Sequence, residues 1–339
     1  MSMCDIVIPV WNQLDVTRDC LESIVKNTLY PYRIVIVDNA SDDPTREYLE
    51  NERKRFGGRI EILRNERNLG FIKAVNSGIS YSDAEYVCVL NNDTLVTRKW
   101  LSELILVMNK DKRIGIVNPS SNNLGQRIPK KIKIEDYVSM LQKHSGEYCR
   151  LGSVLGFCML TRRSLFREIG LFDEIFGMGN FEDTDLSYRA KKKGYMLVRA
   201  VGSYVFHKEN RSFRLLKSYR KDFEKNKRIF EDRWGRTERL LFVFGDSPGP
   251  RDIRVGLIER ELNDNNWVFV ALKKGPAMNI CHSHLTQHVF RGLFPVKIMT
   301  KILFKKKKFD RVYCDDKRFM GWVVIFRPFH GASVNLIDK

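Results

Sequence analysis

Two short polar segments and one histidine carry side chains that could do chemistry. Asn91, Asn92 and Asp93 follow an apolar run at residues 86–90. A carboxylate placed there can bind Mg²⁺ or Mn²⁺ together with a diphosphate, because these hard cations prefer oxygen ligands and keep phosphate oxygens in their shell. An isolated Asp after a strand can equally cap a turn, so the residues alone leave both interpretations open.

His207 and Asp38 also follow apolar runs. Neutral imidazole, as in His207, is a suitable ligand for Mn²⁺ when a carboxylate shares the ion, although a single His is often structural. Asp38 follows the run Ile-Val-Ile-Val at residues 34–37. It could accept a hydrogen bond from a base imide or a ribose hydroxyl at the ligand edge of a sheet, or it could form a turn.

Three acids gather at the predicted start of a helix. Glu182, Asp183 and Asp185 lie within residues 179–185. Negative charge is favourable at a helix N-terminus, which accounts for one or two of the three acids. The alternative is a general base, because a carboxylate within hydrogen-bond reach of a hydroxyl can take its proton as the hydroxyl attacks.

The elements that must position these side chains alternate between strand and helix. Short apolar runs rich in β-branched residues predict strands, and apolar spacing near 3.6 residues predicts helices. The strands are predicted at residues 5–10, 33–37, 59–63 and 86–90, and the helices at 14–27, 44–55 and 71–79. This pattern indicates an α/β fold with a mostly parallel sheet, whose ligands bind beyond the carboxyl ends of the strands.

The sequence predicts a domain boundary near Gly235. Before it come helices predicted at residues 163–169 and 183–193, a strand at 195–201 and a long basic helix at 213–234. After it a new alternation begins, with strands predicted at 240–244, 267–272, 312–314 and 322–326 and a helix at 253–262. We therefore expect one domain at residues 1–235 and a small basic α/β region at 236–339.

The composition fits a globular protein, since 43% of the 339 residues are hydrophobic. The seven cysteines are scattered without a C-x-x-C pair, so we expect buried free thiols in a reducing compartment. Neither a signal-peptide pattern nor an apolar stretch of about 18 residues is present. We expect a cytoplasmic protein that can also lie at the inner face of the membrane. The net charge of +18 favours anionic partners.

The order of these segments resembles glycosyltransferase family 2, and it is most similar to a bacterial rhamnosyltransferase-like branch. The resemblance covers residues 4–235 and rests on the segments at 8–12, 37–42, 65–71, 90–94 and 181–189, followed by His207. It implies the GT-A fold, which is Rossmann-like with a mostly parallel sheet. It also implies a nucleotide-sugar donor carrying UDP or dTDP, a divalent cation (Mn²⁺ or Mg²⁺) and inversion at the anomeric carbon.

The resemblance implies roles for individual residues as well. Asp183 matches the catalytic base, with Glu182 beside it. Asp93 matches the last acid of the family's D-x-D metal motif, whose other two positions are Asn here, and His207 matches a histidine that completes the metal or diphosphate site. The nucleotide-sugar contacts match Pro9, Asn12, Asp38, Asn68, Lys73, Asn76, Asn92 and Asp93, and the acceptor side matches Gly156 and Phe157.

The activity expected from this resemblance is metal-dependent transfer of a sugar to a glycan or lipid-linked hydroxyl in cell-surface polysaccharide synthesis. A nucleotidyltransferase is the alternative, but the Gly-rich, Lys-containing phosphate loop that it needs after the first strand is missing. A nucleic-acid-binding protein would explain the basic charge alone. No helix-turn-helix, zinc-finger or RNP-type motif is present, so we expect no nucleic-acid partner.

The C-terminal region adds two further expectations. Residues 297–308 hold six Lys and no acid, which predicts attraction to an anionic membrane surface as well as the alternative of a solvated helix face. Residues 240–339 faintly resemble the opening of a GT-B-type glycosyltransferase domain, which would be incomplete at this length.

Overall fold

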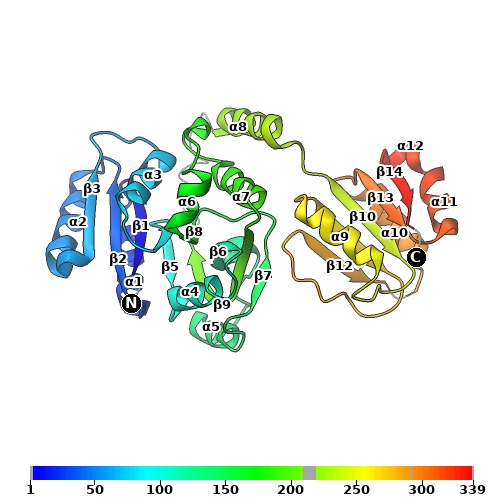
Figure 1. Cartoon of the computed structure of the whole chain (residues 1–339), viewed down its shortest axis with the longest axis horizontal. Helices are drawn as coiled ribbons and strands as arrows, with labels where there is room; N and C mark the ends of the chain where they lie inside the picture. Colours follow the sequence, from blue (N-terminus) through cyan, green and yellow to red (C-terminus); the bar gives the residue numbers. More distant parts are fainter. Residues whose placement is uncertain (1–2, 209–218, 291, 338–339) are drawn as a thin grey trace. The chain divides into compact units, whose positions relative to one another are not determined.

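The computed structural model describes residues 3–208, 219–290 and 292–337. Among them the chain forms two compact units, shown in Figure 1. The N-terminal unit comprises Met1–Cys149 and Ser153–Trp234, and the C-terminal unit comprises Arg150–Gly152 and Gly235–Lys339. Within these described ranges, no helix is both long enough and apolar enough to cross a membrane.

The N-terminal unit contains strands and helices in alternation. Its helices are α1 (Leu14–Asn27), α2 (Asp43–Phe56), α3 (Phe71–Tyr81), α4 (Trp100–Met108), α5 (Ile134–Gln142), α6 (Arg163–Ile169), α7 (Glu182–Lys192) and α8 (Tyr219–Trp234). Its strands are β1 (Cys4–Val10), β2 (Tyr32–Asp38), β3 (Ile60–Arg64), β4 (Tyr86–Leu90), β5 (Thr94–Val96), β6 (Ile114–Ser120), β7 (Tyr148–Arg150), β8 (Cys158–Arg162) and β9 (Met196–His207). The basic helix predicted at 213–234 agrees with α8, and its first six residues lie outside the described ranges.

These strands form one mixed sheet in the order β3-β2-β1-β4-β8-β6-β9-β5, with β7 also paired to β9. Strands β1 to β4 run parallel, as do β6 and β9. Strand β8 is antiparallel to β4 and β6, and β5 is antiparallel to β9. The predicted α/β fold with a mostly parallel sheet is confirmed. Strands β1, β2 and β4 are almost fully buried because helices cover both faces.

The register of the parallel strands brings the candidate residues to one edge of the sheet. Val10 pairs with Asp38, and Asp38 pairs with Arg64. Helix α3 can pack closely over this half because Gly78 has no side chain. A Cβ atom there would lie 2.4 Å from a methyl carbon of Val7. The polar loops that follow β1, β2 and β3 therefore meet at their carboxyl ends.

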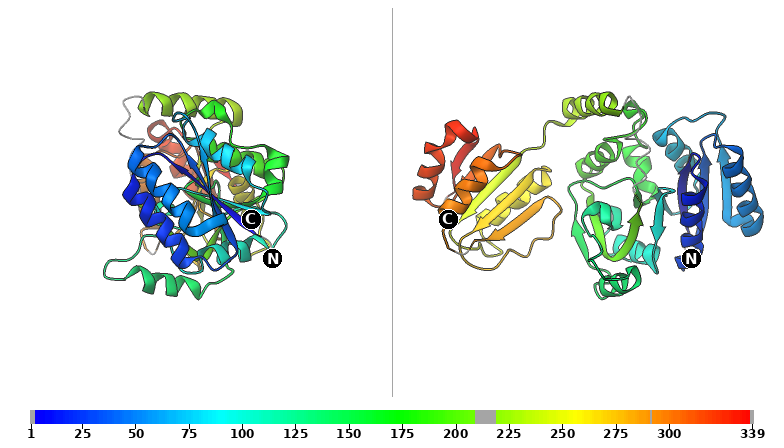
Figure 2. Two further views of the ribbon diagram at one scale, coloured as in Figure 1. Left: turned by 90° about the vertical axis from the view of Figure 1, so that its left-hand side faces the viewer. Right: turned by 180° about the vertical axis from the view of Figure 1, so that it is seen from behind.

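The C-terminal unit is built on a second, all-parallel sheet. Its strands are β10 (Arg239–Phe244), β11 (Trp267–Leu272), β12 (Leu285–Val289), β13 (Arg311–Cys314) and β14 (Ser333–Leu336), in the order β12-β11-β10-β13-β14. Its helices are α9 (Ile253–Asn263), α10 (Phe294–Phe304), α11 (Lys317–Ile325) and α12 (Arg327–His330). Helix α9 packs on one face of the sheet and α10 and α11 on the other, drawn yellow and orange to red in Figure 2.

One strand predicted in this unit is wrong. Residues 322–326 lie mostly in α11, not in a strand. Phe319 and Val323 are buried four residues apart, which is a helical spacing, and the Asp316 carboxylate caps the helix by accepting the amide hydrogens of Arg318 and Phe319. The short apolar run in this segment fits either structure, so periodicity could not decide.

The expectation for the cysteines is wrong at two positions. Cys4, Cys20, Cys88, Cys158 and Cys314 are buried free thiols, as expected. Cys149 and Cys281 are disulfide-bonded. Nothing in the local sequence of either cysteine marks it as disulfide-bonded. Because disulfides are rare in reducing compartments, the cysteines no longer support the expected cytoplasmic location.

Candidate active site

Asp38 lies fully buried at the carboxyl end of β2. Its Oδ1 accepts the amide hydrogen of Ser41 at 2.9 Å. Its Oδ2 lies 2.7 Å from the Arg64 guanidinium and forms an ion pair with it. The angles of this contact do not make a hydrogen bond, so Oδ2 has no hydrogen-bond partner. Oδ1 therefore fixes the loop after β2, and Oδ2 is the oxygen that a donor group of a ligand could use.

Asn39 ties together the loops that follow β2 and β3. Its amide nitrogen donates to Asn68 Oδ1 at 3.0 Å and to the carbonyl of Gly70 at 3.1 Å. Its amide oxygen accepts from Asn65 Nδ2 at 2.8 Å and from the Leu69 amide at 3.1 Å. The predicted residue Asn68 thus belongs to a network centred on Asn39, which the sequence analysis did not single out. The signal was present in the asparagines that follow two adjacent strands.

The loop after β1 joins the same edge. Asn12 has a positive φ of 55°, its amide donates to Ser41 Oγ at 2.9 Å, and its Oδ1 accepts from the Asp42 amide at 2.7 Å. Pro9 lies partly buried near the end of β1. The structure therefore brings Pro9, Asn12, Asp38 and Asn68 to one edge, and their contact with a nucleotide stays a prediction.

Two predicted residues on α3 contact a different segment. The Asn76 side chain donates to the carbonyl of Phe172 at 2.9 Å and accepts the amide hydrogen of Phe172 at 3.1 Å. The Lys73 ammonium lies 3.7 Å from Glu174, and both side chains are about half exposed. These contacts hold α3 to the segment before α7, and a nucleotide role for either residue stays a prediction.

Asp93 and His207 come together because β5 and β9 are antiparallel neighbours. Thr94 pairs with His207 in the register, and Asp93 Oδ1 lies 2.9 Å from His207 Nε2. Phe157 stacks on the imidazole with the ring centres 5.2 Å apart. Asn92 points toward α1 instead, where its Nδ2 donates to Thr17 Oγ1 at 2.9 Å. The two residues predicted to bind the metal therefore form a contacting pair without Asn92.

The Asp93–His207 pair suits a cation that takes most of its ligands from phosphate groups and water. Within residues 3–208, 219–290 and 292–337, no three His, Cys, Asp or Glu side chains gather into a metal cluster. One carboxylate and one imidazole can suffice for Mg²⁺ or Mn²⁺, because phosphates and water fill the remaining positions. Asn123 Nδ2 contacts His207 Nδ1, and a neutral imidazole that accepts a hydrogen bond there carries its ring proton on Nε2. Cation binding at Nε2 would therefore require the other tautomer, with the Asn123 oxygen turned toward Nδ1.

Glu182 and Asp183 begin α7 directly after a tight turn. Asn180 and Phe181 both have positive φ, 75° and 74°. Burial, and then the negative charge of Asp183, raises the pKa of Glu182 to about 8. Burial also raises the pKa of Asp183, whose carboxylate accepts hydrogen bonds from the Gly156 amide at 3.0 Å and the Thr184 hydroxyl at 3.2 Å. Glu182 Oε2 is buried without a hydrogen-bond partner.

Two consecutive residues join the acid pair to the Asp93–His207 pair. Gly156 donates its amide hydrogen to Asp183, and Phe157 stacks on His207. The Phe157 carbonyl also accepts the Asn91 amide hydrogen at 2.8 Å, next to Asp93. The predicted catalytic and metal residues are therefore neighbours across a single short segment, although Asp93 and Asp183 lie far apart in the sequence.

Helix α8 fixes the turn that precedes Glu182, a role that its sequence pattern did not indicate. Asn226 Nδ2 donates to the carbonyls of Phe176 and Gly179, each at 2.8 Å. Asp185, which was grouped with the other acids, is instead paired with cations. Its carboxylate contacts Arg189 at 2.7 Å and Arg233 at 2.8 Å. Its charge is balanced, which separates it from Glu182 and Asp183.

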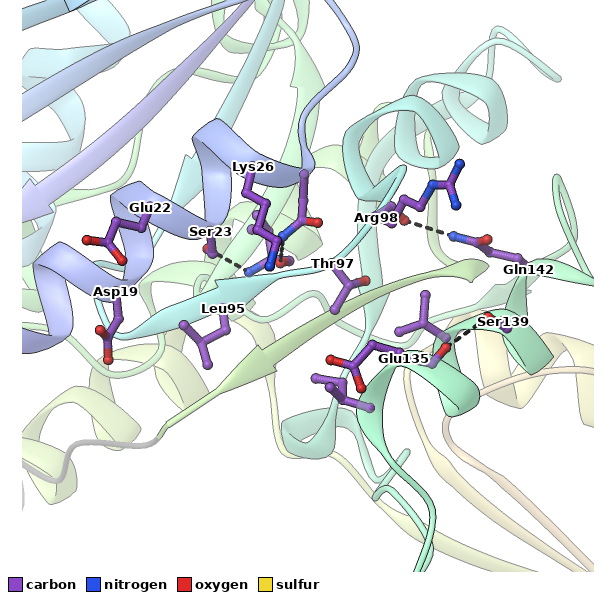
Figure 3. A pocket seen from close by; sticks show the side chains of 14 residues that line it. Asp19, Glu22, Ser23, Lys26, Leu95, Thr97, Arg98, Glu135, Ser139 and Gln142 are labelled. Atoms are coloured by element: carbon purple, nitrogen blue, oxygen red, sulfur yellow. Dashed lines mark hydrogen bonds between the residues drawn. The ribbon is translucent and has the colours of Figure 1, made fainter. Parts of the chain in front are cut away.

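A pocket of about 590 Å³ that the sequence analysis did not predict lies among α1, β5 and α5 (Figure 3). Asn27 and Ser23 of α1 hold β5 through bonds of 3.1 Å to the carbonyl and amide of Val96. Asp19, at the wall of the pocket, is ion-paired with Lys208, and the Lys208 amide donates to the Asp93 carbonyl at 2.9 Å. The pocket thus adjoins the segment that carries His207.

Comparison with known proteins places this geometry in context. Residues 5–170 match the family described as Glycosyl transferase family 2. The probable N-acetylgalactosaminyltransferase 7 of Caenorhabditis elegans is 24% identical over 198 residues, which cover 52% of this chain and 33% of that protein. The structure of GalNAc-T7 with UDP, GalNAc and Mn²⁺ aligns with a TM-score of 0.51 at 21% identity, over 61% of this chain and 44% of that one. Mannosyltransferase PcManGT from Pyrobaculum calidifontis, in complex with GDP-Man and Mn²⁺, aligns with a TM-score of 0.51 at 17% identity, over 66% and 64% of the two chains.

The chain spans only 25% to 34% of the length of the first curated relatives that it matches. The structural alignments have low sequence identity and establish the GT-A-like fold alone. The family match is more specific, because it spans the strand that carries Asp38 and the turn that carries Asp93, and it reaches Gly156 and Phe157. Residues 5–170 of this chain are therefore a glycosyltransferase family 2 sequence.

Proposed function

We propose that the chain is an inverting glycosyltransferase that moves a sugar from a nucleotide-sugar donor to an acceptor hydroxyl. The observation that carries the proposal is the link between Asp183 and the Asp93–His207 pair through Gly156 and Phe157. Asp183, the proposed base for the acceptor, then lies beside the Asp93–His207 pair, which suits a cation bound to a diphosphate. The buried Asp38 at the same sheet supports a nucleoside site.

In the proposed mechanism, Asp183 accepts the proton of the acceptor hydroxyl while the hydroxyl oxygen attacks the anomeric carbon. The new bond forms on the face opposite the nucleoside diphosphate as the old bond breaks, so the anomeric centre inverts. The proton ends on Asp183, and the negative charge leaves on the diphosphate. Asp93 and His207 would hold a divalent cation, which neutralises the charge that grows on this leaving group.

A thermal-shift screen tests the donor part of this proposal, because a ligand that binds the folded state raises the melting temperature. The screen would include UDP-sugars, dTDP-rhamnose for the predicted rhamnosyltransferase-like branch, and GDP-mannose, each with Mn²⁺. We expect a shift with at least one of them and none with the Asp38→Ala variant. The proposal would be wrong if no nucleotide or nucleotide sugar shifted the wild-type protein. With the donor found, NMR of the product tests inversion.

The divalent cation is a separate part of the proposal. It is supported by the Asp93–His207 contact and by the Mn²⁺ in the GalNAc-T7 and PcManGT structures. We expect a chelator to stop transfer and Mn²⁺ or Mg²⁺ to restore it. His207→Ala should raise the Mn²⁺ concentration needed for half-maximal activity by about 10- to 100-fold. Full activity in the chelator would remove the metal from the mechanism.

We also propose that the C-terminal unit rests on an anionic membrane surface, where a lipid-linked acceptor for polysaccharide synthesis would be found. Phe304, Ile325 and Phe329 are 80%, 68% and 71% exposed on α10, α11 and α12. Lysines at 305–308 follow Phe304 directly. Phe304 near the exposed Lys306, Lys307 and Lys308 suits the interface of an anionic bilayer, where each surface Lys contributes about 1 kcal/mol.

Vesicle flotation tests the membrane proposal. We expect the full chain to bind vesicles that contain phosphatidylglycerol and not vesicles of phosphatidylcholine alone. The triple variant Phe304→Ser, Ile325→Ser, Phe329→Ser should lose most of this binding. Leu29→Ser is the matched control, because Leu29 is 71% exposed on the N-terminal unit. Equal binding to both vesicle types, or by the triple variant, would contradict the proposal.

A further inference from the structure

The all-parallel sheet of the C-terminal unit has a point where its strand order reverses. From β10 the chain continues to β11 on one side, whereas β13 pairs with β10 on the other side and leads to β14. Loops that leave β10 and β13 therefore diverge at their carboxyl ends. In open parallel sheets, ligands bind in the crevice that such a divergence creates.

A cavity of about 430 Å³ lies at this point. Gly245 and Asp246 follow β10, Lys273 follows β11 and Asp315 follows β13, and all four line the cavity. Its volume falls within the range of pockets that hold small molecules. None of these residues belongs to the family 2 match, which ends at residue 170. The cavity is therefore a separate candidate site.

An ionic network centred on the buried Arg254 and Asp315 supports one side of this cavity. The Arg254 side chain is 5% exposed and contacts Asp315 at 2.6 Å, Asp252 at 2.6 Å and Asp246 at 3.1 Å. The Asp315 side chain is 1% exposed and accepts the amide hydrogen of Gly245 at 2.9 Å. Buried charges are costly to desolvate. This network fixes the loop after β10 against the end of β13, so the cavity has a defined shape.

The other walls of the cavity carry cations and an exposed indole. Lys273, Lys274 and Arg318 line it, and Trp322 lines it while 58% exposed. Helix α10, whose first residue Phe294 also lines the cavity, has no side-chain cap at its N-terminus. Lysines and an arginine favour a phosphate group, whereas the helix start adds few amide hydrogens because Pro295 has none. The indole offers a face for a ring to stack on.

We propose that this cavity binds a phosphorylated small molecule that carries a ring and hydroxyl groups, that is, a sugar phosphate or a nucleotide. Lys273, Lys274 and Arg318 contact the phosphate, Trp322 stacks on the ring, and Asp246 accepts hydrogen bonds from the hydroxyls. The chain then holds a second ligand site besides the donor site proposed for the N-terminal unit. The two sites share no residue, because all the residues of this one lie beyond residue 234.

Hydrogen–deuterium exchange of the full chain locates binding by peptide and so separates the two sites. The probes are uridine 5′-monophosphate, glucose 1-phosphate and inorganic phosphate. We expect one of the two organic phosphates to slow exchange in peptides covering residues 245–250 and 315–322, and the more effective probe identifies the ligand as nucleotide or sugar phosphate. The same protection should persist in Asp38→Ala, where donor binding is removed.

Substitutions test the residues of the cavity. The double variant Lys273→Ala, Lys274→Ala should weaken protection about tenfold, and so should Trp322→Ala, whose exposed side chain can be removed without harm to the fold. The matched control is Lys306→Ala, Lys307→Ala, which loses the same charge outside the cavity and should leave protection unchanged. No protection with either organic phosphate, equal protection by inorganic phosphate, or equal effects of the two lysine pairs would each overturn the proposal.

Discussion

The two sides of the candidate active site differ in how their polar groups are satisfied. On the side of Asp38, the buried Asn39 uses its amide in four hydrogen bonds, and the Asp38 charge lies against Arg64. On the side of α7, the buried Glu182 and the partly buried Asp183 are neighbouring acids, and the pKa of each is raised. One side is a hydrogen-bonded scaffold, whereas the other stores unfavourable electrostatic energy.

This difference indicates where stability and function separate. Buried acids without a balancing cation destabilise the folded state once they ionise. Asp185, one helical turn from Glu182, has two arginine partners, so the fold can supply cations at this helix. Glu182 and Asp183 have none among their described contacts, which fits a pair kept for proton transfer and not for stability. Substitutions on the two sides should therefore have opposite effects.

The largest effect is expected for Asp183→Asn. Removing the proposed base should lower the rate of sugar transfer by about 10²- to 10⁴-fold, because an amide cannot take the acceptor proton. The Gly156 amide can still donate to the amide oxygen, so nucleotide binding and melting temperature should not fall. Steady-state kinetics and thermal shift measure the two quantities.

Asp15→Asn serves as the control for this change. Its side chain is 92% exposed on α1 and pairs only loosely with Arg18, at 3.5 Å. We expect the control to keep the wild-type rate. Unchanged turnover in Asp183→Asn would exclude this residue as the base, and a large loss of stability would show that the site is a scaffold like the Asp38 side.

Asn39→Ala should have the next largest effect, and on stability. Its four partners would lose their bonds in a buried setting, so we expect the free energy of unfolding to fall by roughly 2–4 kcal/mol. Asn27→Ala, which removes a single bond to the Val96 carbonyl, should cost about 1 kcal/mol. Urea titrations compare the two. Equal losses would mean that the Asn39 network is no stronger than an ordinary contact.

The sequence could predict the parts of the site that follow from strands. Asp38, Asp93 and His207 each end or follow a buried run, and parallel strands bring such positions to one edge. Side-chain directions could not be predicted in the same way. The Asn92 side chain turns to Thr17 of α1, and Asp185 of α7 pairs with Arg233 of α8. Both contacts depend on packing between segments far apart in the sequence.

In the C-terminal unit, the sequence could predict some helices and strands and not others. Strand β10 and helix α9 were predicted because their patterns are unambiguous, while α11 was taken for a strand because residues 322–326 are apolar throughout. The disulfide-bonded state of Cys149 and Cys281 had no local signal at all. Periodicity identifies elements that have one buried face, and it fails where burial is set by tertiary contacts.

The smallest effect, and the sharpest test of the stored electrostatic energy, is the pH dependence of Glu182→Gln. The pKa of Glu182 is about 8 in the folded chain against 4.5 as its ordinary value. Between these values the unfolded chain has lost the proton and the folded chain retains it, so unfolding releases a proton and wild-type stability falls as pH rises. Glutamine does not ionise, so the variant lacks this fall in stability. Its stability relative to wild type should therefore grow by roughly 1–3 kcal/mol from pH 5 to pH 8, since one pKa unit corresponds to about 1.4 kcal/mol. Urea titrations across this range, with the exposed Glu47→Gln as control, measure the difference. A constant difference between variant and wild type would show that Glu182 ionises normally, and the contrast between the two sides of the site would then rest on Asp183 alone.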